Sequence, residues 1–299
     1  MRFPREGGRG DEDMRKAHGL IVAAAFLAFC ATGRQPPLSD SPAIAFPCEW
    51  PGSPGFSGNI DTQGIIDPSG VCFYPPARTL FIVSDEGELY EIRTDGTPLS
   101  YMKIPGDLEE ITLDPQSGLM YIAVEGEDVI LEFDPAKREI LRTFHIDHEF
   151  QGNPHFLKRD PDRYDNGIES LAFVPDARHP EGGTFFAGNQ EDPPCILELS
   201  VPLKSGLGPI GEAKILRVLP TRLRDPGAML YDPETRLLNV VSDSDNILLE
   251  ITLDGKIVGE FAFPGNSQEG IAMDDEGFIY IAQDSGGIIK LKDLRKKFR

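Results

Sequence analysis

Short apolar runs separated by turn-forming residues recur along most of the chain. The stretch "QEGIAMDDEGFIYIAQDSGGIIKL", residues 268–291, contains three such runs with Asp-rich and Gly-rich corners between them. Runs of about five residues that are rich in Ile, Val and aromatic side chains and end at Gly, Pro or Asp are typical of β-strands. Long runs with apolar residues at helical spacing are hard to find, so the pattern predicts an all-β protein.

The same unit is repeated along the sequence, with copies that start near residues 67, 107, 166, 225 and 267. Two of the copies, "DPSGVCFYPPARTLFIVSDEGELYEIRTDG" and "DPGAMLYDPETRLLNVVSDSDNILLEITLDG", are plainly alike. Each copy predicts a strand, a Pro/Asp/Gly turn, a second strand, a polar corner and a third strand, and a fourth strand usually follows. Four antiparallel strands that recur at roughly 40 residues predict the blades of a single β-propeller.

The five copies predict five four-stranded blades, and a sixth, degenerate blade within an insertion or within residues 41–66 stays open. The copies are spaced near 40 residues twice and near 59 residues twice, so the second and third blades carry insertions. The last copy ends after its third strand. We therefore expect the segment 56–66 to supply the missing outer strand and to close the ring.

Two columns of polar residues run through the five copies. The first column, at the start of the first strand, holds Ser69, Glu109, Glu169, Gly227 and Glu269. The second column, at the end of the next strand, holds Asp85, Glu125, Asn189, Asp243 and Asp284. The two strands form a hairpin, so we expect Glu109 to lie roughly opposite Glu125. Because the first strand of a blade lines the central channel, both columns are predicted to meet at one mouth of that channel.

Carboxylates that share such a mouth repel one another. Two like charges about 6 Å apart at an effective dielectric of about 20 repel by roughly 3 kcal/mol. A divalent cation, which we expect to be Ca²⁺, relieves this repulsion because calcium accepts shells made only of oxygen. Histidine and cysteine are absent from both columns, which disfavours zinc. The predicted metal ligands are Asp85, Glu109, Glu125, Glu169, Asn189, Asp243, Glu269 and Asp284. The alternative is that these residues merely end strands and stay solvated at a wide mouth.

The charge of the chain narrows the range of partners. The 299 residues include 29 Lys and Arg against 49 Asp and Glu, for a formal net charge of −20. Such a surface repels phosphate backbones, so nucleic acid is excluded as a partner. We expect a monomer whose partner is a small molecule or a protein of the cell envelope.

The N-terminal residues have the features of an export signal. "MRKAHGLIVAAAFLAFC" has a basic start at Met14 and an apolar run from Gly19 to Phe29. "LAFC" resembles a lipoprotein box ending at Cys30, although Phe29 stands where a small residue is expected. Residues 1–30 are therefore predicted to be a signal peptide, and lipidation at Cys30 and ordinary cleavage both stay open. Either route places the protein in the periplasm or cell envelope, with membrane association through its N-terminus if it is lipidated.

Residues 31–55 are rich in Pro, Ser and Gly and are predicted to be a tether, followed by the propeller over residues 56–299. Cys48, Cys72 and Cys195 remain after the signal, and one disulfide that uses Cys48 is open. The basic end "KLKDLRKKFR" is predicted to be a solvated tail. Docking of this tail on the acidic propeller, or on a membrane surface, is the alternative.

The repeated elements resemble those of the SdiA-regulated family of bacterial envelope propellers. The resemblance rests on "DPSGVCFYP" with "LFIVSDE", on "DLEEITLDP" with "MYIAVE", and on "QEGIAMDDEGFIYIAQD", and it covers residues 56–295. It implies a single propeller that is exported or membrane-anchored, with a metal in the channel and no established reaction. Related patterns occur in lactonase-type propellers. In this chain, Glu109, Glu169, Asn189, Asp243 and Glu269 have the residue types of a lactonase-like site. Their order around the ring does not match that site.

Three functional hypotheses follow. The first is a calcium-binding propeller that acts as a binding module for a ligand or a partner protein. The second is a metal-dependent hydrolase of the lactonase or phosphoesterase type, in which Glu169 or Glu269 activates water. The third is an interaction scaffold with an empty channel. The sequence assigns no catalytic set, so it leaves open whether the protein is an enzyme.

Overall fold

The structure is a computed structural model that describes residues 43–51, 58–159, 167–206, 208–223 and 225–297. The predicted export signal and Cys30 lie outside the described residues. Within the part of the chain that is described, no helix is long and apolar enough to cross a membrane.

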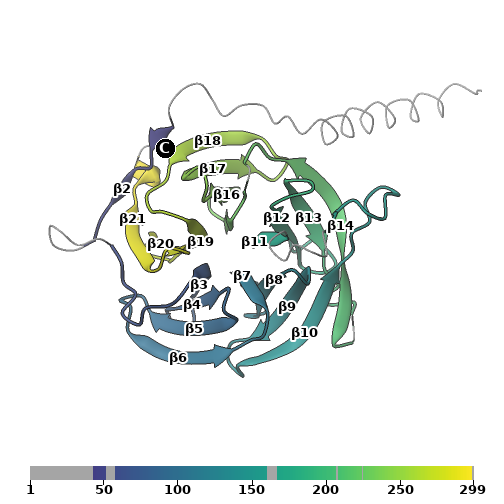
Figure 1. The fold of residues 1–299 in the computed structure, drawn as a ribbon, viewed down its shortest axis with the longest axis horizontal. Helices are drawn as coiled ribbons and strands as arrows, with labels where there is room; N and C mark the ends of the chain where they lie inside the picture. Colours follow the sequence, from purple (N-terminus) through teal and green to yellow (C-terminus); the bar gives the residue numbers. More distant parts are fainter. Residues whose placement is uncertain (1–42, 52–57, 160–166, 207, 224, 298–299) are drawn as a thin grey trace, which may run out of the picture. The chain divides into compact units, whose positions relative to one another are not determined.

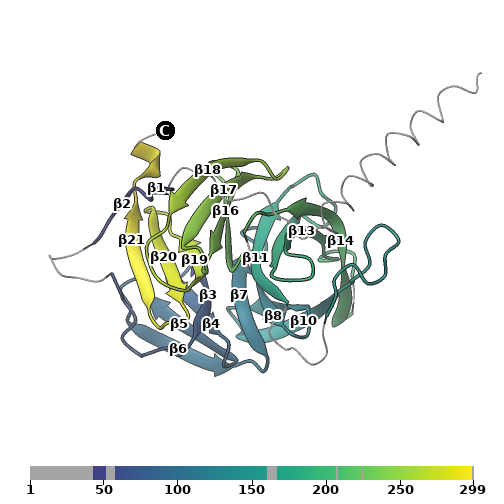
Figure 2. The same ribbon diagram turned by 45° about the horizontal axis from the view of Figure 1, so that its top comes forward.

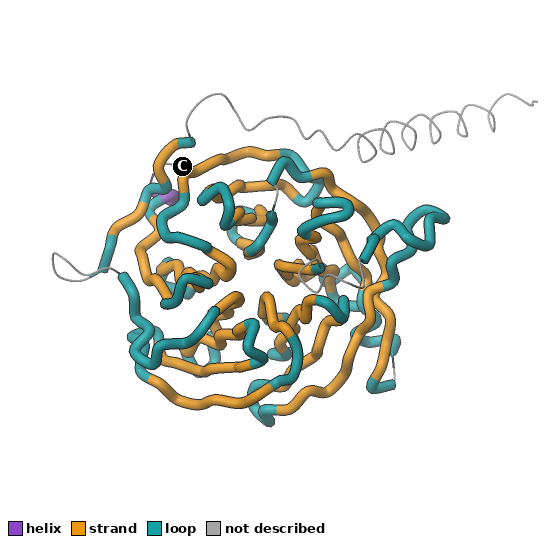
Figure 3. Tube along the Cα trace, viewed as in Figure 1, coloured by secondary structure: helices purple, strands orange, loops and turns teal. Residues whose placement is uncertain are grey.

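Nearly all of the described chain forms β-strands joined by short turns and loops (Figure 3). Consecutive strands pair in antiparallel meanders, as apolar runs separated by turn residues require. The first four meanders comprise β3 (Pro68–Tyr74), β4 (Thr79–Ser84), β5 (Glu88–Arg93), β6 (Pro98–Lys103), β7 (Asp107–Leu113), β8 (Met120–Glu125), β9 (Val129–Asp134), β10 (Glu139–Ile146), β11 (Ile168–Pro175), β12 (Gly183–Asn189), β13 (Cys195–Ser200), β14 (Ile210–Pro220), β15 (Ala228–Asp232), β16 (Leu237–Ser242), β17 (Ile247–Thr252) and β18 (Ile257–Ala262). The last meander comprises β19 (Gln268–Met273), β20 (Phe278–Gln283) and β21 (Ile288–Asp293), and the short strands β1 (Ile44–Ala45) and β2 (Cys48–Glu49) precede them all.

The meanders surround a central axis, with the first strand of each nearest to the axis and the fourth on the outside (Figure 1). One sheet contains β3 to β6, and another contains β15 to β18 with β1 at its edge. The meanders β7 to β10 and β11 to β14 share one eight-stranded sheet, because their outer strands β10 and β14 pair in parallel. This radial arrangement confirms the prediction of an all-β protein with a propeller fold.

The core lies between neighbouring meanders. Every residue of β4 and of β8 is buried, since these strands are covered on both faces, whereas the outer strand β6 is exposed or half-exposed along its length. Between the first two meanders, the rings of Phe81 and Phe133 pack edge to face with their centroids 6.1 Å apart. Burial of these apolar runs is the main source of stability for the fold.

Two segments complete the last meander beside β21. Asn59 bridges to Ile289, and the amide of Ile60 donates to the carbonyl of Ile288 at 2.8 Å, so part of the predicted segment 56–66 does pair there. The other end of β21 pairs with β2, where Cys48 lies opposite Asp293. β1 pairs in parallel with β18 (Figure 2). Residues 44–45 and 48–49, which the sequence assigned to the tether, therefore form part of the sheets.

The three cysteines of the described chain are thiols and form no disulfide. They lie on β2, at the middle of β3 and at the start of β13, which belong to different meanders. The disulfide that the sequence left open for Cys48 is not present.

The basic C-terminal segment is docked on the propeller as far as Arg295. Lys290 and Lys292 belong to β21, and Arg295 is buried in the 3₁₀ turn η1 (Arg295–Lys297). The Nη1 atom of Arg295 donates to Glu250 Oε1 at 2.7 Å, and its Nη2 donates to Asp293 Oδ2 at 2.8 Å. The prediction of a solvated tail was wrong, because an arginine with two buried carboxylate partners anchors the end of the chain to the neighbouring meander.

We expect Arg295→Ala to lower the free energy of unfolding by about 3 kcal/mol, because it removes the cation from two buried carboxylates. Chemical denaturation followed by circular dichroism measures this loss. Lys296→Ala is the matched control, since Lys296 pairs with Glu234 at the exposed surface; it should cost less than about 1 kcal/mol. Equal stability of the two variants would show that the tail does not anchor the fold.

Candidate functional site

Seven of the eight predicted ligands are carboxylates, and the structure brings all seven together at one mouth of the central channel. The charges of Asp85, Glu125 and Glu269, which come from three other parts of the chain, raise the pKa of Glu109. Glu169 is influenced by Glu109 and Glu125. Glu269 in turn is influenced by Asp284, Asp85 and Asp243. The seven residues are Asp85, Glu109, Glu125, Glu169, Asp243, Glu269 and Asp284, and below they are called the acidic mouth.

The first column of the acidic mouth sits in β-bulges. Pairing between β11 and β12 runs from Ile168↔Asn189 to Ser170↔Gly188, so Glu169 is the extra residue. Glu269 is skipped in the same way between β19 and β20, and Ser69 between β3 and β4. A bulge leaves its extra residue out of the ladder and turns the side chain away from the alternating pattern of the strand. Repeated bulges therefore give this column a common orientation.

The bulges shift the register that the sequence predicted. In the hairpin of β7 and β8, Glu125 lies opposite Asp107 and not opposite Glu109. Glu109 and Glu110 together occupy the bulge that follows, between the pairs Leu108↔Val124 and Ile111↔Ile122. The prediction that Glu109 faces Glu125 was therefore wrong by two residues, although both side chains still reach the acidic mouth.

A third column of carboxylates was missed. Asp107 lies two residues before Glu109, and the equivalent positions hold Asp67 and Asp225 in two other copies. Single carboxylate oxygens of Asp85, Asp107 and Glu109 all lie within 4.8 Å of one another. The repeated "DP" that opens two of the copies was the available signal, since it places an acidic residue at a fixed distance before the strand. Gly227 occupies the first column but has no side chain. Oδ1 of Asp225 lies near this position.

Burial and mutual repulsion raise the pKa values of these groups. Desolvation, followed by the charges of Asp284 and other carboxylates, raises the pKa of Glu269 to about 9. Desolvation and the hydrogen bond with Asp243 raise the pKa of Asp225 to about 8. Burial raises the pKa of Asp85 to about 6, although a hydrogen bond from Ser69 opposes the shift. The pKa values of Glu109 and Glu169 also lie well above the usual range, chiefly through burial.

Several buried oxygen atoms in and beside the acidic mouth accept no hydrogen bond. They include Oδ1 of Asp107, Oδ1 of Asp225 and Oδ1 of Asp243, and Gln190 Oε1 is in the same state. A buried acceptor without a donor carries a desolvation cost, so such atoms are usually satisfied by water or by an ion. The donor set, which contains only oxygen, fits a hard divalent cation.

Asn189 is the predicted ligand that differs from the others. Its Nδ2 donates to the carbonyls of Glu191 and Pro193 at 2.7 and 2.8 Å, and its Oδ1 accepts from Arg159 Nη2 at 2.7 Å. Arg159 also donates to both carboxylate oxygens of Asp128. The Asn189 side chain is thus bonded to the corner after β12 and to Arg159, in the connection between β10 and β11.

Glu110, the neighbour of Glu109, is bonded to the inner strands and not to the acidic mouth. Its side chain is fully buried, with Oε1 accepting from the amide of Ile111 at 3.0 Å and Oε2 from that of Met229 at 3.4 Å. The amide of Val71 hydrogen-bonds to the same carboxyl group. One glutamate of β7 therefore joins the inner strands β3 and β15. The sequence placed Glu109 in the polar column and gave no role to the neighbouring Glu110.

The inner strands approach one another closely at glycines beside this carboxyl group. A Cβ atom at Gly70 would lie 2.7 Å from the Cα of Glu110, and one at Gly270 would lie 2.6 Å from the carbonyl oxygen of Ser69. Backbone atoms at these distances leave no space for a larger residue. The inner strands therefore pack tightly around Glu110.

Comparisons with known proteins place the chain in a family. No protein with a curated description matches it. The crystal structure of Myxococcus xanthus glutaminyl cyclase is similar over 78% of this chain and 92% of that chain, with a TM-score of 0.51 and 12% sequence identity. A likeness at that identity concerns the fold alone. Residues 53–286 match the SdiA-regulated family, which the repeated strand elements resembled, and this chain belongs to that family.

Proposed function

We propose that this chain is a cation-dependent binding module, a five-bladed propeller whose acidic mouth holds Ca²⁺. The observation that carries the proposal is the convergence of Asp85, Asp107 and Glu109, whose carboxylate oxygens lie within 4.8 Å of one another. The charged neighbours that raise the pKa values of Glu109, Glu169 and Glu269 most are acidic. A bound cation supplies the missing positive charge.

Calcium fits this mouth better than smaller or softer cations. It takes six to eight oxygen ligands at variable geometry, whereas magnesium demands a tight octahedron and zinc prefers nitrogen and sulfur. Asp85, Asp107 and Glu109 supply three ligands on one side of the mouth. The remaining positions are available to water or to a carboxylate or hydroxyl group of a ligand, which would bind through the ion.

A binding role is preferred over the hydrolase alternative. A general base must be unprotonated at the working pH. Burial and neighbouring carboxylates raise the pKa of Glu269 to about 9, so it is protonated near neutral pH when the site has no cation, and burial also raises the pKa of Glu169 well above its usual range. With a cation bound, both carboxylates neutralise the ion and are poorly placed to accept a proton from water.

The proposal includes export. The N-terminal pattern of an export signal, a lipoprotein-like "LAFC" and a Pro-rich segment suit a domain held in the periplasm or at the cell envelope. Extracytoplasmic calcium sites work at micromolar to millimolar ion concentrations, which a moderate-affinity site of this kind would sense.

Isothermal titration of the metal-free protein with calcium and with magnesium tests the proposal. We expect saturable calcium binding with proton release, because cation binding deprotonates raised-pKa carboxyl groups. Asp107→Asn and Glu109→Gln each remove one charged ligand and should weaken calcium binding at least about tenfold. Both changes also relieve repulsion, so the variants should fold at least as well as the parent protein.

Glu139→Gln is the matched control for charge, because Glu139 lies on the exposed end of β10 and pairs only loosely with Lys137 at 3.9 Å. It should leave calcium affinity unchanged. Absence of calcium binding at low millimolar concentration, or equal affinity in the control and in Asp107→Asn, would remove the cation from the proposal.

A further inference from the structure

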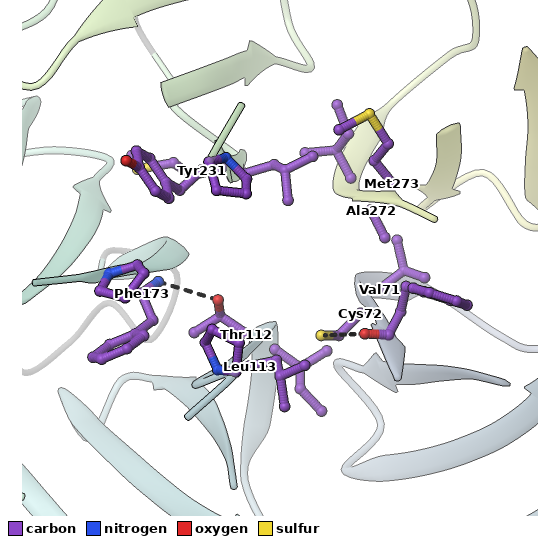
Figure 4. Close-up of a pocket in the computed structure, with 16 residues that line it drawn as sticks. Val71, Cys72, Thr112, Leu113, Phe173, Tyr231, Ala272 and Met273 are labelled. Atoms are coloured by element: carbon purple, nitrogen blue, oxygen red, sulfur yellow. Dashed lines mark hydrogen bonds between the residues drawn. The ribbon is translucent and has the colours of Figure 1, made fainter. Parts of the chain in front are cut away.

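The channel end opposite the acidic mouth is an apolar cavity. Its volume is about 140 Å³, and its wall is built from the inner strands of all the meanders (Figure 4). The residues labelled there are Val71, Cys72, Thr112, Leu113, Phe173, Tyr231, Ala272 and Met273. The Thr112 hydroxyl, the polar side chain among the labelled residues besides Tyr231 and Cys72, accepts from the amide of Phe173 at 3.1 Å. A cavity of this size and lining accommodates a benzene-sized group.

This cavity is a compartment separate from the cation site. The amides of Val71 and Met229, two residues that line it, donate to the carboxyl group of Glu110, which does not itself line the cavity. Glu110 therefore lies between the acidic mouth and the cavity. The cavity also shares no lining residue with the cluster of Asp85, Asp107 and Glu109.

A polar cleft adjoins the cavity. The cleft has a volume of about 410 Å³ and shares Pro175, Tyr231 and Pro233 with the cavity. Its charged lining residues are Arg178, His179, Arg217, Arg236, Asp176 and Glu198. Three arginines against two carboxylates give a net charge of +1 with His179 neutral, in a chain whose net charge is −20. The cleft thus attracts an anion on a surface that otherwise repels anions.

The arginines of the cleft differ in how far they are engaged. Arg178 pairs with Asp176 at 3.1 Å, and Arg217 donates to Glu198 at 2.8 Å and to the carbonyl of Leu253 at 2.7 Å. Arg236 is exposed and forms no ion pair with any of the described residues. Its guanidinium is therefore available to a carboxylate, for which the planar fork of arginine is well suited.

We propose that the cavity and the cleft together bind a small amphipathic monocarboxylate, an acid with one aromatic or branched aliphatic group. The apolar group fills the cavity between Phe173, Met229 and Met273, and the carboxylate lies in the cleft beside Arg236. Tyr231 stands at the boundary, where an aromatic face and a phenolic hydroxyl can contact both parts of such a ligand. The single net positive charge of the cleft favours a monoanion over a phosphate.

Titration with phenylacetate, followed by calorimetry or ligand-observed NMR, tests this proposal. Acetate lacks the apolar group and benzyl alcohol lacks the charge, so both should bind more weakly than phenylacetate. Arg236→Gln should weaken phenylacetate binding about five- to tenfold and leave benzyl alcohol unaffected. Met273→Trp fills the cavity and should abolish binding of both. Arg93→Gln, an exposed arginine on β5, is the matched control and should change nothing.

Folding of each variant is checked by its thermal melt, and calcium affinity serves as the internal control. Met273→Trp and Arg236→Gln should bind calcium as the parent protein does, because their sites lie at the other end of the channel. Absence of saturable phenylacetate binding at millimolar concentration would overturn the proposal. So would binding that Arg236→Gln leaves unchanged, or benzyl alcohol binding as tightly as phenylacetate.

Discussion

Without calcium, the protein is expected to lose thermal stability as the pH rises from about 5 to about 9. Burial and neighbouring charges raise the pKa of Asp85 to about 6, of Asp225 to about 8 and of Glu269 to about 9. In the unfolded chain the same groups titrate near 4. Between these values the folded state binds more protons than the unfolded state, so the free energy of unfolding falls as pH rises.

The stabilising contribution of each group is fully present below its unfolded pKa and is lost as the pH passes its folded pKa. Asp85 therefore loses its share near pH 6, and Asp225 and Glu269 lose theirs between about pH 8 and 9. Calcium reverses the trend, because it binds the deprotonated carboxylates and its affinity increases with pH. At a hundredfold excess over the dissociation constant, calcium should stabilise the fold by about 2.7 kcal/mol. For a domain of this size, that corresponds to roughly 5 to 10 °C in the melting temperature.

Thermal melts at several pH values, with EDTA and with calcium, measure both effects. Glu269→Gln removes a group that titrates near pH 9 and should raise the melting temperature of the metal-free protein at that pH. Glu139→Gln should follow the parent curve. A metal-free melting temperature that does not change with pH, or a calcium effect that is equal at pH 6 and pH 9, would contradict the proposed mouth.

The repeat made much of this architecture predictable. Strand-length apolar runs at fixed spacing place the polar positions of each copy at equivalent points around an axis. That symmetry brings Asp85 and Asp284 together, although 198 residues of sequence separate them. Sequence alignment of the copies was therefore sufficient to find the seven carboxylates of the acidic mouth.

What the repeat could not predict depends on departures from ideal pairing. Counting residues from a turn assumes a regular ladder, and the bulges at Glu109 and Glu169 break that assumption. Arg295 was assigned to a solvated tail because its buried partners, Glu250 and Asp293, look like ordinary strand residues. Such contacts depend on the three-dimensional arrangement of neighbouring meanders, which composition does not encode.

The adjacent glutamates of the β7 bulge are expected to have opposite effects when replaced. Glu110→Ala should lower the free energy of unfolding by about 3 to 5 kcal/mol, because it leaves buried backbone amides of three inner strands without an acceptor. Glu109→Ala should leave the metal-free protein as stable as the parent protein or more stable at pH 8, since it removes one charge from a repelling cluster.

Urea denaturation of the metal-free proteins and of the calcium-loaded proteins separates the two roles. Glu109→Ala should lose most of the calcium-induced stabilisation, whereas Glu110→Ala should lose stability in both states. Glu110→Gln is the conservative variant, since it keeps one oxygen acceptor for the amides at the axis and should cost less than the alanine change. Similar stability of Glu110→Ala and Glu109→Ala would show that the central carboxyl group does not hold the inner strands together. Glu109 and Glu110 are adjacent residues of the same type in one bulge. The comparison therefore tests directly whether the bulge assigns one glutamate to the ion and the other to the fold.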